Sequence, residues 1–132
     1  MNKFIVIFIF LSSLFSGQAQ SCECIKADAE TGMQHADRVF SASIVATKVS
    51  GKWVDIEISR PTSLKGGKPP NHLRTPLGKS ACGQSIKTPE TYIFFTNFNG
   101  DFDSCGATAE LASPGMDALR NKIESKNIEG ER

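Results

Sequence analysis

Four cysteines have the clearest chemical potential in this sequence, namely Cys22, Cys24, Cys82 and Cys105. An even number of cysteines in a small exported domain predicts two disulfides, and the amino-terminal segment described below indicates export. A zinc site is the competing interpretation. Zinc motifs usually place cysteines in close pairs with about two to four residues between them, whereas Cys82 and Cys105 each stand alone. We therefore predict disulfides and no metal site of the chain's own.

The spacing of the first two cysteines restricts their pairing. Cys22 and Cys24 are two residues apart, so on an extended strand both side chains point to the same face. A bond between them would close a cramped ring, far from normal disulfide geometry. Each should instead pair with Cys82 or Cys105, and this argument leaves both combinations open. Either combination pins the segment to the domain at two points, and Glu23 should face solvent or a partner.

Residues 1–20 have the features of a secretory signal peptide. Lys3 supplies a positive charge, and the 12 residues of 4–15 are apolar except for two serines. This run is too short to cross a bilayer, which needs about 20 residues of helix. Two cleavage sites fit the small-residue rule, one after Ala19, which we favour, and one after Ser21. We expect an extracellular or periplasmic protein without a transmembrane segment.

The composition is that of one ordinary globular domain. The chain has 132 residues with 15 basic and 14 acidic side chains, so its formal net charge is +1. Hydrophobic residues make up 39% and charged residues 22%, which is far from the disordered range. This balance excludes a strongly basic nucleic-acid-binding protein and an acidic disordered chain. We place the domain at residues 21–126 and a polar tail at 127–132.

Alternating side chains predict an antiparallel hairpin. Residues 40–47 and 54–59 each alternate apolar and polar residues, with Ser50-Gly51 between them. Residues 91–96 are the most β-prone run, and because their apolar stretch is continuous, we expect a central strand with both faces covered. Together these strands predict a small β-barrel or β-sandwich.

The other segments predict less regular structure and one late helix. Residues 26–37 fit a loop or a short turn of helix, and prolines and glycines interrupt 60–80, although a short strand fits near Leu73. Ser113-Pro114 resembles a helix cap followed by proline at the first helical position. The apolar stripe of this helix consists of Met116, Leu119 and Ile123.

No catalytic motif is visible, so we predict that the chain is not an enzyme and has no cofactor. The two histidines, His35 and His72, belong to no recognised catalytic or metal-binding arrangement. Asp101 and Asp103 flank a turn and could bind calcium, although turn formation is the commoner role of such a pair. Trp53 fits packing on a strand better than a binding platform.

A set of short motifs resembles one family in order and spacing. The motifs lie within residues 22–126: Cys22-Glu23-Cys24, 36–40, 64–66, 81–83, 92–95 and Ser104-Cys105. They resemble netrin-like modules and the inhibitory domain of tissue inhibitors of metalloproteinases. The resemblance implies a mainly β fold, a five-stranded OB-type antiparallel barrel with a C-terminal helix. It also implies the disulfide pairing Cys22–Cys82 and Cys24–Cys105.

The resemblance implies an inhibitory mechanism as well. In these inhibitors the free amino group and the carbonyl of the first cysteine chelate the zinc of the target protease, and the next side chain enters the specificity pocket. Here Cys22 would be the chelating residue and Glu23 the pocket residue, and cleavage after Ser21 would free the amino group. The flanking contacts would come from Cys24, Ile25, Ser80 and Ala81. The expected partner is a zinc metalloprotease or another extracellular protein.

A second hypothesis is a binding module for an acidic polysaccharide. Between Glu57 and Glu90 the chain contains basic residues and no acidic one. Such a stretch could bind a polyanion, although a solvated loop with acidic neighbours in space is the commoner case. Nucleic acid is not expected as a partner of an exported protein. The candidate residues are Arg60, Lys65, Lys68, Arg74, Lys79 and Lys87.

Overall fold

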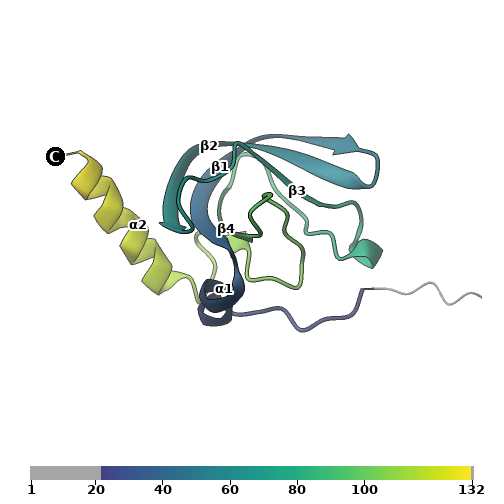
Figure 1. Ribbon diagram of the computed structural model, residues 1–132, viewed down its shortest axis with the longest axis horizontal. Coiled ribbons are helices and arrows are strands. Elements are labelled where there is room, and N and C mark those ends of the chain that lie inside the picture. The colour runs from purple at the N-terminus through teal and green to yellow at the C-terminus, as the bar shows by residue number, and fades with distance from the viewer. Residues whose placement is uncertain (1–21, 132) are drawn as a thin grey trace, which may run out of the picture.

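The computed structural model describes residues 22–131 (Figure 1). The predicted signal peptide and its two cleavage sites lie outside the described residues. None of the helices in the described part has both the length and the apolar character needed to cross a membrane. The elements are α1 (Ala29–His35), β1 (Arg38–Ser50), β2 (Trp53–Lys65), β3 (His72–Pro76), the 3₁₀ helix η1 (Lys79–Ala81), β4 (Thr91–Thr96), β5 (Ala109–Glu110) and α2 (Asp117–Gly130).

The strands form one antiparallel sheet in the order β3-β2-β1-β4-β5. The loop after β4 returns to β3 and closes the sheet, because Arg74 and Asp101 form a parallel bridge. The N–H of Arg74 donates to the carbonyl of Gly100, and the N–H of Phe102 donates to the carbonyl of Arg74, both at 3.1 Å. The predicted mainly β, OB-like barrel with five antiparallel strands, a C-terminal helix and two disulfides is confirmed.

Side chains reinforce this closure. The Arg74 guanidinium forms two hydrogen bonds with the Asp101 carboxylate, of 2.6 and 3.2 Å. The same guanidinium lies over the ring of Trp53, with its carbon 4.1 Å from the ring centroid. Trp53 therefore packs on the strands, as predicted, and Arg74 links the first residue of β2 to the loop after β4.

The predicted hairpin of β1 and β2 is confirmed, but β2 continues past Pro61 into the segment that we expected to be irregular. The pairing register with β1 shifts between Ser59 and Thr62, and Arg60 has a positive φ of 52°. Such a β-bulge bends the strand and lets a proline sit outside the regular hydrogen-bond ladder. The prediction of an interruption at residue 60 was therefore wrong. The short strand expected near Leu73 is β3.

The core has two apolar clusters, one on each face of β4. Tyr92 and Phe94 point into the first cluster, and Ile93 and Phe95 into the second. Both faces of this strand are covered, as its continuous apolar run predicted. The remaining buried members of the first cluster are Phe40, Ala42, Ile44, Ile56, Leu73 and Phe102. Those of the second are Val39, Ala107, Met116, Leu119 and Ile123.

The short helix α1 connects the amino-terminal segment to β1. Asp28 caps it, because its carboxylate accepts the N–H of Thr31 at 2.8 Å. Gly32 packs so closely on the barrel that an added Cβ would lie 2.5 Å from the Cβ of Ala107 and 2.6 Å from Phe95. Gly32 weakens the helical pattern of the sequence, but its lack of a side chain is what lets α1 pack against the barrel.

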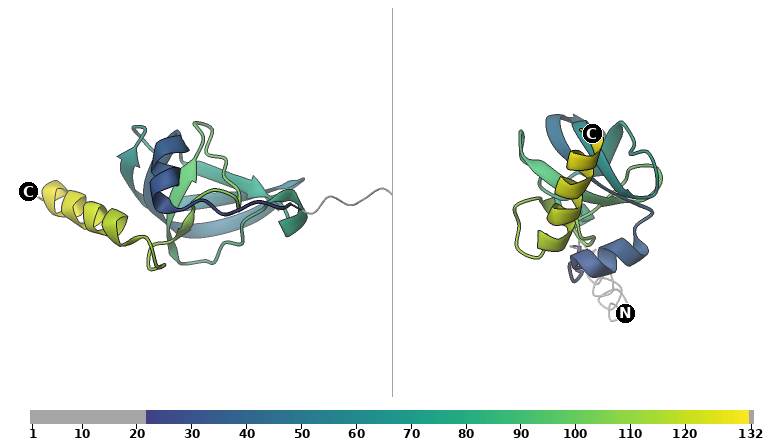
Figure 2. Two further views of the ribbon diagram at one scale, coloured as in Figure 1. Left: turned by 90° about the horizontal axis from the view of Figure 1, so that it is seen from below. Right: turned by 90° about the vertical axis from the view of Figure 1, so that its left-hand side faces the viewer.

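The helix α2 begins later than Ser113-Pro114 predicted. Gly115 has a φ of 87°, which is incompatible with helix, so the helix starts only at Asp117. Its predicted apolar stripe, Met116, Leu119 and Ile123, is buried. Residues 127–130, which we expected to be a polar tail, are exposed but helical. The helix and the start of the amino-terminal segment lie at opposite ends of the molecule (Figures 1 and 2).

Candidate functional site: the N-terminal edge

Two disulfides attach the first described residues to the barrel. They join Cys22 to Cys82 and Cys24 to Cys105, with Cα atoms 5.2 and 5.7 Å apart, separations that are usual for a disulfide. This is the pairing that the family resemblance implied. The two bonds close long loops, with sequence separations of 60 and 81 residues. We call residues 22–25, together with Ser80 and Ala81, the N-terminal edge.

The two disulfides lie against each other. All four Sγ atoms are within 4.8 Å of one another. The Sγ of Cys105 is 3.8 Å from that of Cys22 and 3.6 Å from that of Cys82. Four thiolates in this arrangement could bind a metal, but both pairs are bonded and leave no thiolate as a ligand. The sequence predicted two bridges, and did not predict that they touch.

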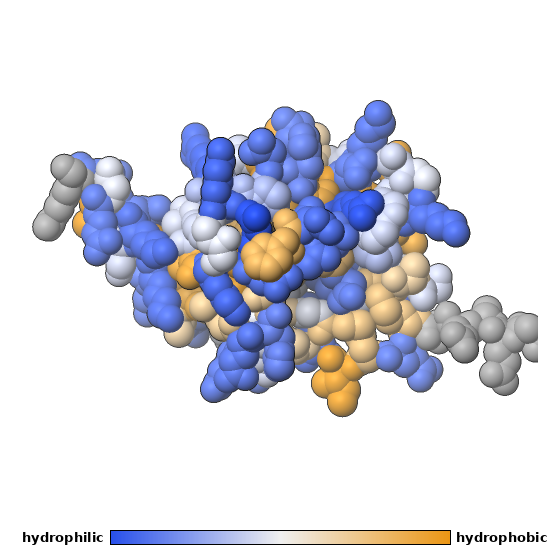
Figure 3. Space-filling view, in the orientation of Figure 1, coloured by the Kyte–Doolittle hydropathy of each residue, from blue (hydrophilic) through white to orange (hydrophobic). Residues whose placement is uncertain are grey.

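The N-terminal edge is accessible and has an apolar component. Glu23, Cys24, Ile25, Ser80 and Ala81 are all exposed. The side chain of Ile25 is 96% exposed, the largest exposure among the large apolar residues of the described chain. The surface in Figure 3 includes apolar patches beside the grey amino-terminal residues, within a surrounding that is mostly polar. The sequence prediction that Glu23 faces solvent is confirmed.

Hydrogen bonds hold the chain immediately after this edge. The N–H of Ala27 donates to the carbonyl of Cys105 at 2.9 Å. The Lys26 ammonium donates to the carbonyls of Gly106 and Thr108, at 3.2 and 2.9 Å. Partial burial lowers the pKa of Lys26, and the charge of Asp103 partly opposes this effect. The chain is therefore fixed both by covalent bonds and by these polar contacts.

The loop that carries Cys82 is fixed by backbone contacts. Cys82 has a positive φ of 64° and follows η1, so Ser80 and Ala81 lie directly beside the disulfide. The N–H of Ser104 donates to the carbonyl of Cys82 at 2.8 Å. This bond holds the loops of Cys82 and Cys105 together without the help of either disulfide.

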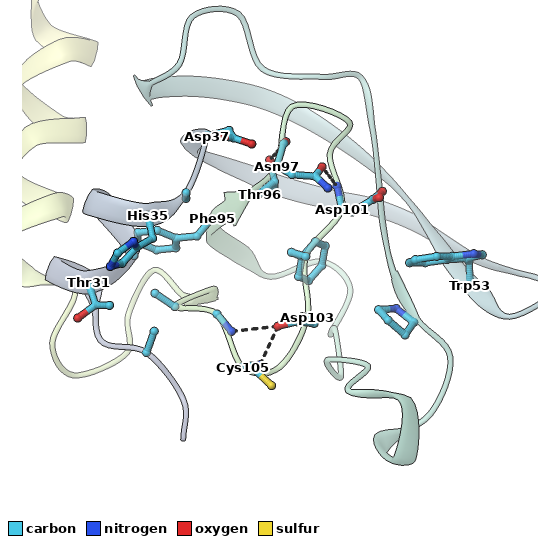
Figure 4. Close-up of a pocket in the computed structure, with 17 residues that line it drawn as sticks. Thr31, His35, Asp37, Trp53, Phe95, Thr96, Asn97, Asp101, Asp103 and Cys105 are labelled. Atoms are coloured by element: carbon cyan, nitrogen blue, oxygen red, sulfur yellow. Dashed lines mark hydrogen bonds between the residues drawn. The ribbon is translucent and has the colours of Figure 1, made fainter. Parts of the chain in front are cut away.

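A cavity of about 540 Å³ lies between α1 and the loop after β4 (Figure 4). His35, Asp37 and Phe95 are among its lining residues. The carboxylate of Asp103, at the same cavity, accepts the N–H groups of Cys105 and Gly106 at 2.9 and 3.1 Å. Nothing in the sequence indicated this cavity, because α1 had no strong helical pattern.

The acidic pair that could have bound calcium is engaged within the protein. Asp101 pairs with Arg74, and Asp103 accepts backbone N–H groups of its own turn. Hydrogen bonds from Arg74 lower the pKa of Asp101. The turn interpretation of these carboxylates is therefore supported by the structure. His35 ends α1 and His72 begins β3, and both are exposed.

The six basic candidates for polyanion binding do not form one cluster. Lys65 is the last residue of β2, whereas Lys79 lies near the other end of that strand. It follows β3, and the last residue of β3 pairs with the first residue of β2. The Lys65 ammonium donates to the carbonyl of Met33 at 2.7 Å, and that of Lys87 is 3.7 Å from Glu110. Arg74 closes the barrel. Arg60, Lys68 and Lys79 are exposed.

Comparisons with known proteins add no relative, since no protein-family model matches this chain and no curated protein matches it either. The netrin-like interpretation consequently stays a prediction from the motifs.

Proposed function

We propose that this chain is an exported, non-enzymatic inhibitor of a zinc metalloprotease, and that the N-terminal edge is its inhibitory surface. One observation carries the proposal. An exposed segment without strand or helix partners is clamped by two adjacent disulfides to a rigid barrel. Such a segment enters a protease cleft without losing much conformational entropy, because the disulfides have already restricted it.

The chemistry proposed for the edge depends on the amino group of Cys22. A catalytic zinc site keeps one coordination position open for water or substrate. A neutral amine and the carbonyl of the same residue can occupy that position as a five-membered chelate and displace the water that hydrolyses the peptide bond. This step requires that Cys22 be the first residue of the mature protein, as cleavage after Ser21 would produce.

The side chains of the edge suggest what the target looks like. Glu23 would enter the pocket beside the zinc, and a buried carboxylate is costly unless a cation pairs with it. We therefore expect a target whose pocket contains arginine or lysine. Ile25 would supply apolar contact area, and Ser80 and Ala81 would contact the cleft from the second loop.

The first experiment is amino-terminal sequencing of the secreted product, followed by inhibition assays. The sequence pattern alone favours a start at Gln20, whereas the proposal predicts a chain that begins at Cys22 and inhibits zinc endopeptidases, with a serine protease as the negative control. The matched variant has one alanine added before Cys22, which converts the amine to an amide and should abolish inhibition. Failure of the Cys22 form to inhibit any zinc endopeptidase with a basic pocket would overturn the proposal.

A product that begins at Gln20 would also overturn the chelating mechanism. It would favour the alternative function, a netrin-like module that binds an extracellular protein or an acidic polysaccharide. Binding to a heparin column distinguishes an acidic polysaccharide from a protein as the partner. Elution at the salt concentration expected from net charge alone would exclude the polysaccharide, since specific polyanion contacts make binding strongly salt-dependent.

A further inference from the structure

We propose that Cys24 is a site of thiol–disulfide exchange, and that a second, internal exchange follows at the other disulfide, so that one external thiol releases residues 22–25 of the N-terminal edge from both covalent anchors. The ligand class is a small thiol or a cysteine of a partner protein. Only the consequence for inhibition rests on the function proposed above, since the exchange itself is a property of the four cysteines.

Accessibility selects the first point of attack. Cys24 is exposed, whereas Cys22, Cys82 and Cys105 are half-buried. Exchange proceeds by attack of a thiolate on a disulfide sulfur, and access decides which sulfur is attacked. An external thiolate therefore reaches the Sγ of Cys24 first. It forms a mixed disulfide with Cys24, the Cys24–Cys105 bond breaks, and the electron pair leaves on the Sγ of Cys105 as a thiolate.

The second step is internal. The Cys105 thiolate lies next to the other disulfide, with its Sγ 3.6 Å from that of Cys82 and 3.8 Å from that of Cys22. The two distances are nearly equal, and Cys82 is the expected target because a hydrogen bond already holds its loop to that of Cys105. Attack on Cys82 forms a Cys82–Cys105 bond, breaks the Cys22–Cys82 bond and leaves the electron pair on Cys22, which takes up a proton as a thiol. No net oxidation or reduction occurs, because one external thiol is consumed and one cysteine thiol appears.

Contacts independent of both disulfides keep the reacting sulfurs together during this exchange. The Ser104 N–H bond to the Cys82 carbonyl joins the two loops. The bonds of Lys26 and Ala27 to the loop of residues 105–108 hold the chain after Cys24 in place. The Cys105 thiolate is therefore held beside Cys82 after the first bond breaks, and the internal step competes well with a second external thiol.

The exchange removes both covalent anchors of residues 22–25, while Ser80 and Ala81 stay on the loop of Cys82. Cys22 then has a free thiol and Cys24 holds the external group, so neither residue is bonded to the barrel. The new Cys82–Cys105 bridge joins two loops that are already hydrogen-bonded to each other. Thus the barrel keeps one disulfide while residues 22–25 of the proposed inhibitory surface lose both of theirs, which would make inhibition sensitive to thiols in the surroundings.

The test uses the oxidised protein and limiting reduced glutathione, followed by blocking of free thiols with N-ethylmaleimide and peptide mapping. We expect glutathione on Cys24, N-ethylmaleimide on Cys22 and a Cys82–Cys105 peptide. The proposal is overturned by glutathione on another cysteine, by blocked Cys105 with an intact Cys22–Cys82 bond, or by a Cys22–Cys105 peptide.

The matched control is the double variant Cys22→Ser with Cys82→Ser, which lacks the second disulfide. The same treatment should then leave glutathione on Cys24 and N-ethylmaleimide on Cys105. If this variant does not fold, the map of the wild-type protein still decides. The peptide map does not depend on a target protease. Failure of the exchange proposal can therefore be distinguished from failure of the inhibitor proposal, which is tested by the inhibition assay on untreated protein. Loss of inhibition after glutathione treatment is expected only if both proposals hold.

Discussion

The N-terminal edge and the helix α2 lie at opposite ends of the molecule and are attached in opposite ways (Figure 2). The edge is held by two disulfides and exposes Ile25 to 96%. The helix contains no cysteine and is held by apolar side chains such as Ile123, which is only 5% exposed. A segment such as α2, whose apolar residues are buried against the barrel, has few of them left to contact a partner. A segment attached by disulfides can keep its apolar side chains exposed, as Ile25 is.

Each form of attachment has a characteristic magnitude. The chain-entropy model gives about 4 kcal/mol for a disulfide that closes a loop of this length. Burial of one isoleucine or leucine contributes about 1.5–3 kcal/mol. The two ends of the molecule are therefore fixed by comparable free energies. They should nevertheless respond to different perturbations, namely thiols at one end and loss of apolar volume at the other.

The largest expected effect is that of removing one disulfide. The double variant Cys24→Ser with Cys105→Ser should lose about 4 kcal/mol of unfolding free energy, because the closed loop spans 81 residues. Urea unfolding measures the loss. Hydrogen exchange should accelerate more at residues 23–27 than at the amides of α2. Equal acceleration at both ends would show that the two attachments are not independent.

The next effect sharpens the comparison with a matched pair of isoleucines. Ile123→Ala should cost about 3 kcal/mol, because it leaves a cavity where α2 packs on the barrel. Ile25→Ala should change stability by less than about 0.5 kcal/mol, because that side chain is exposed. Thermal unfolding of the two variants gives both values. A comparable cost at Ile25 would mean that the edge is held by packing after all.

A pair of helix glycines tests the connection between the edge and the barrel. Gly32→Ala should destabilise by about 2 kcal/mol, because the new methyl group would overlap Ala107 and Phe95. Gly130→Ala meets nothing within 4 Å and should be neutral or stabilising by about 0.5 kcal/mol, as expected for alanine in a helix. Chemical denaturation of both variants is the measurement. Tolerance of alanine at Gly32 would contradict the close docking of α1.

The smallest effect concerns an attachment that is neither covalent nor apolar. Hydrogen bonds from Arg74 lower the pKa of Asp101 below its ordinary value of 3.8. A lowered native pKa means that the carboxylate stabilises the fold above about pH 4 and loses this contribution as the pH falls through the native pKa. The stability difference between wild type and Asp101→Asn should thus be constant from about pH 6 to about pH 8 and shrink below about pH 4. Melting temperatures measured across this range would detect it, and a pH-independent difference would contradict it.

The spacing of apolar residues along the sequence was enough to predict the main strands. The alternation of residues 40–47 and 54–59 and the continuous apolar run of 91–96 correspond to β1, β2 and β4. The failures have tertiary causes. The strand β2 passes Pro61 because a bulge in its pairing with β1 accommodates the proline. The start of α2 is set by the conformation of Gly115, which the cap-like Ser113-Pro114 did not indicate.

The candidate site was predictable only in part. The spacing of Cys22 and Cys24 excluded a bond between them, and the structure contains none. The contact between the two disulfides could not be predicted, because it depends on the hydrogen bond that brings the loop of Ser104 to Cys82. Likewise Arg74 and Asp101 were assigned to separate hypotheses, a polyanion site and a turn, although they form one ion pair.

The stack of Arg74 on Trp53 provides an optical reporter within the protein. Trp53 is the only tryptophan of the chain, and the guanidinium on its ring belongs to the residue that pairs with Asp101. The fluorescence of Trp53 therefore reports on one place in the structure, where β3 contacts the loop after β4. Fluorescence of the unlabelled protein can follow the opening of the barrel where Arg74 meets Asp101.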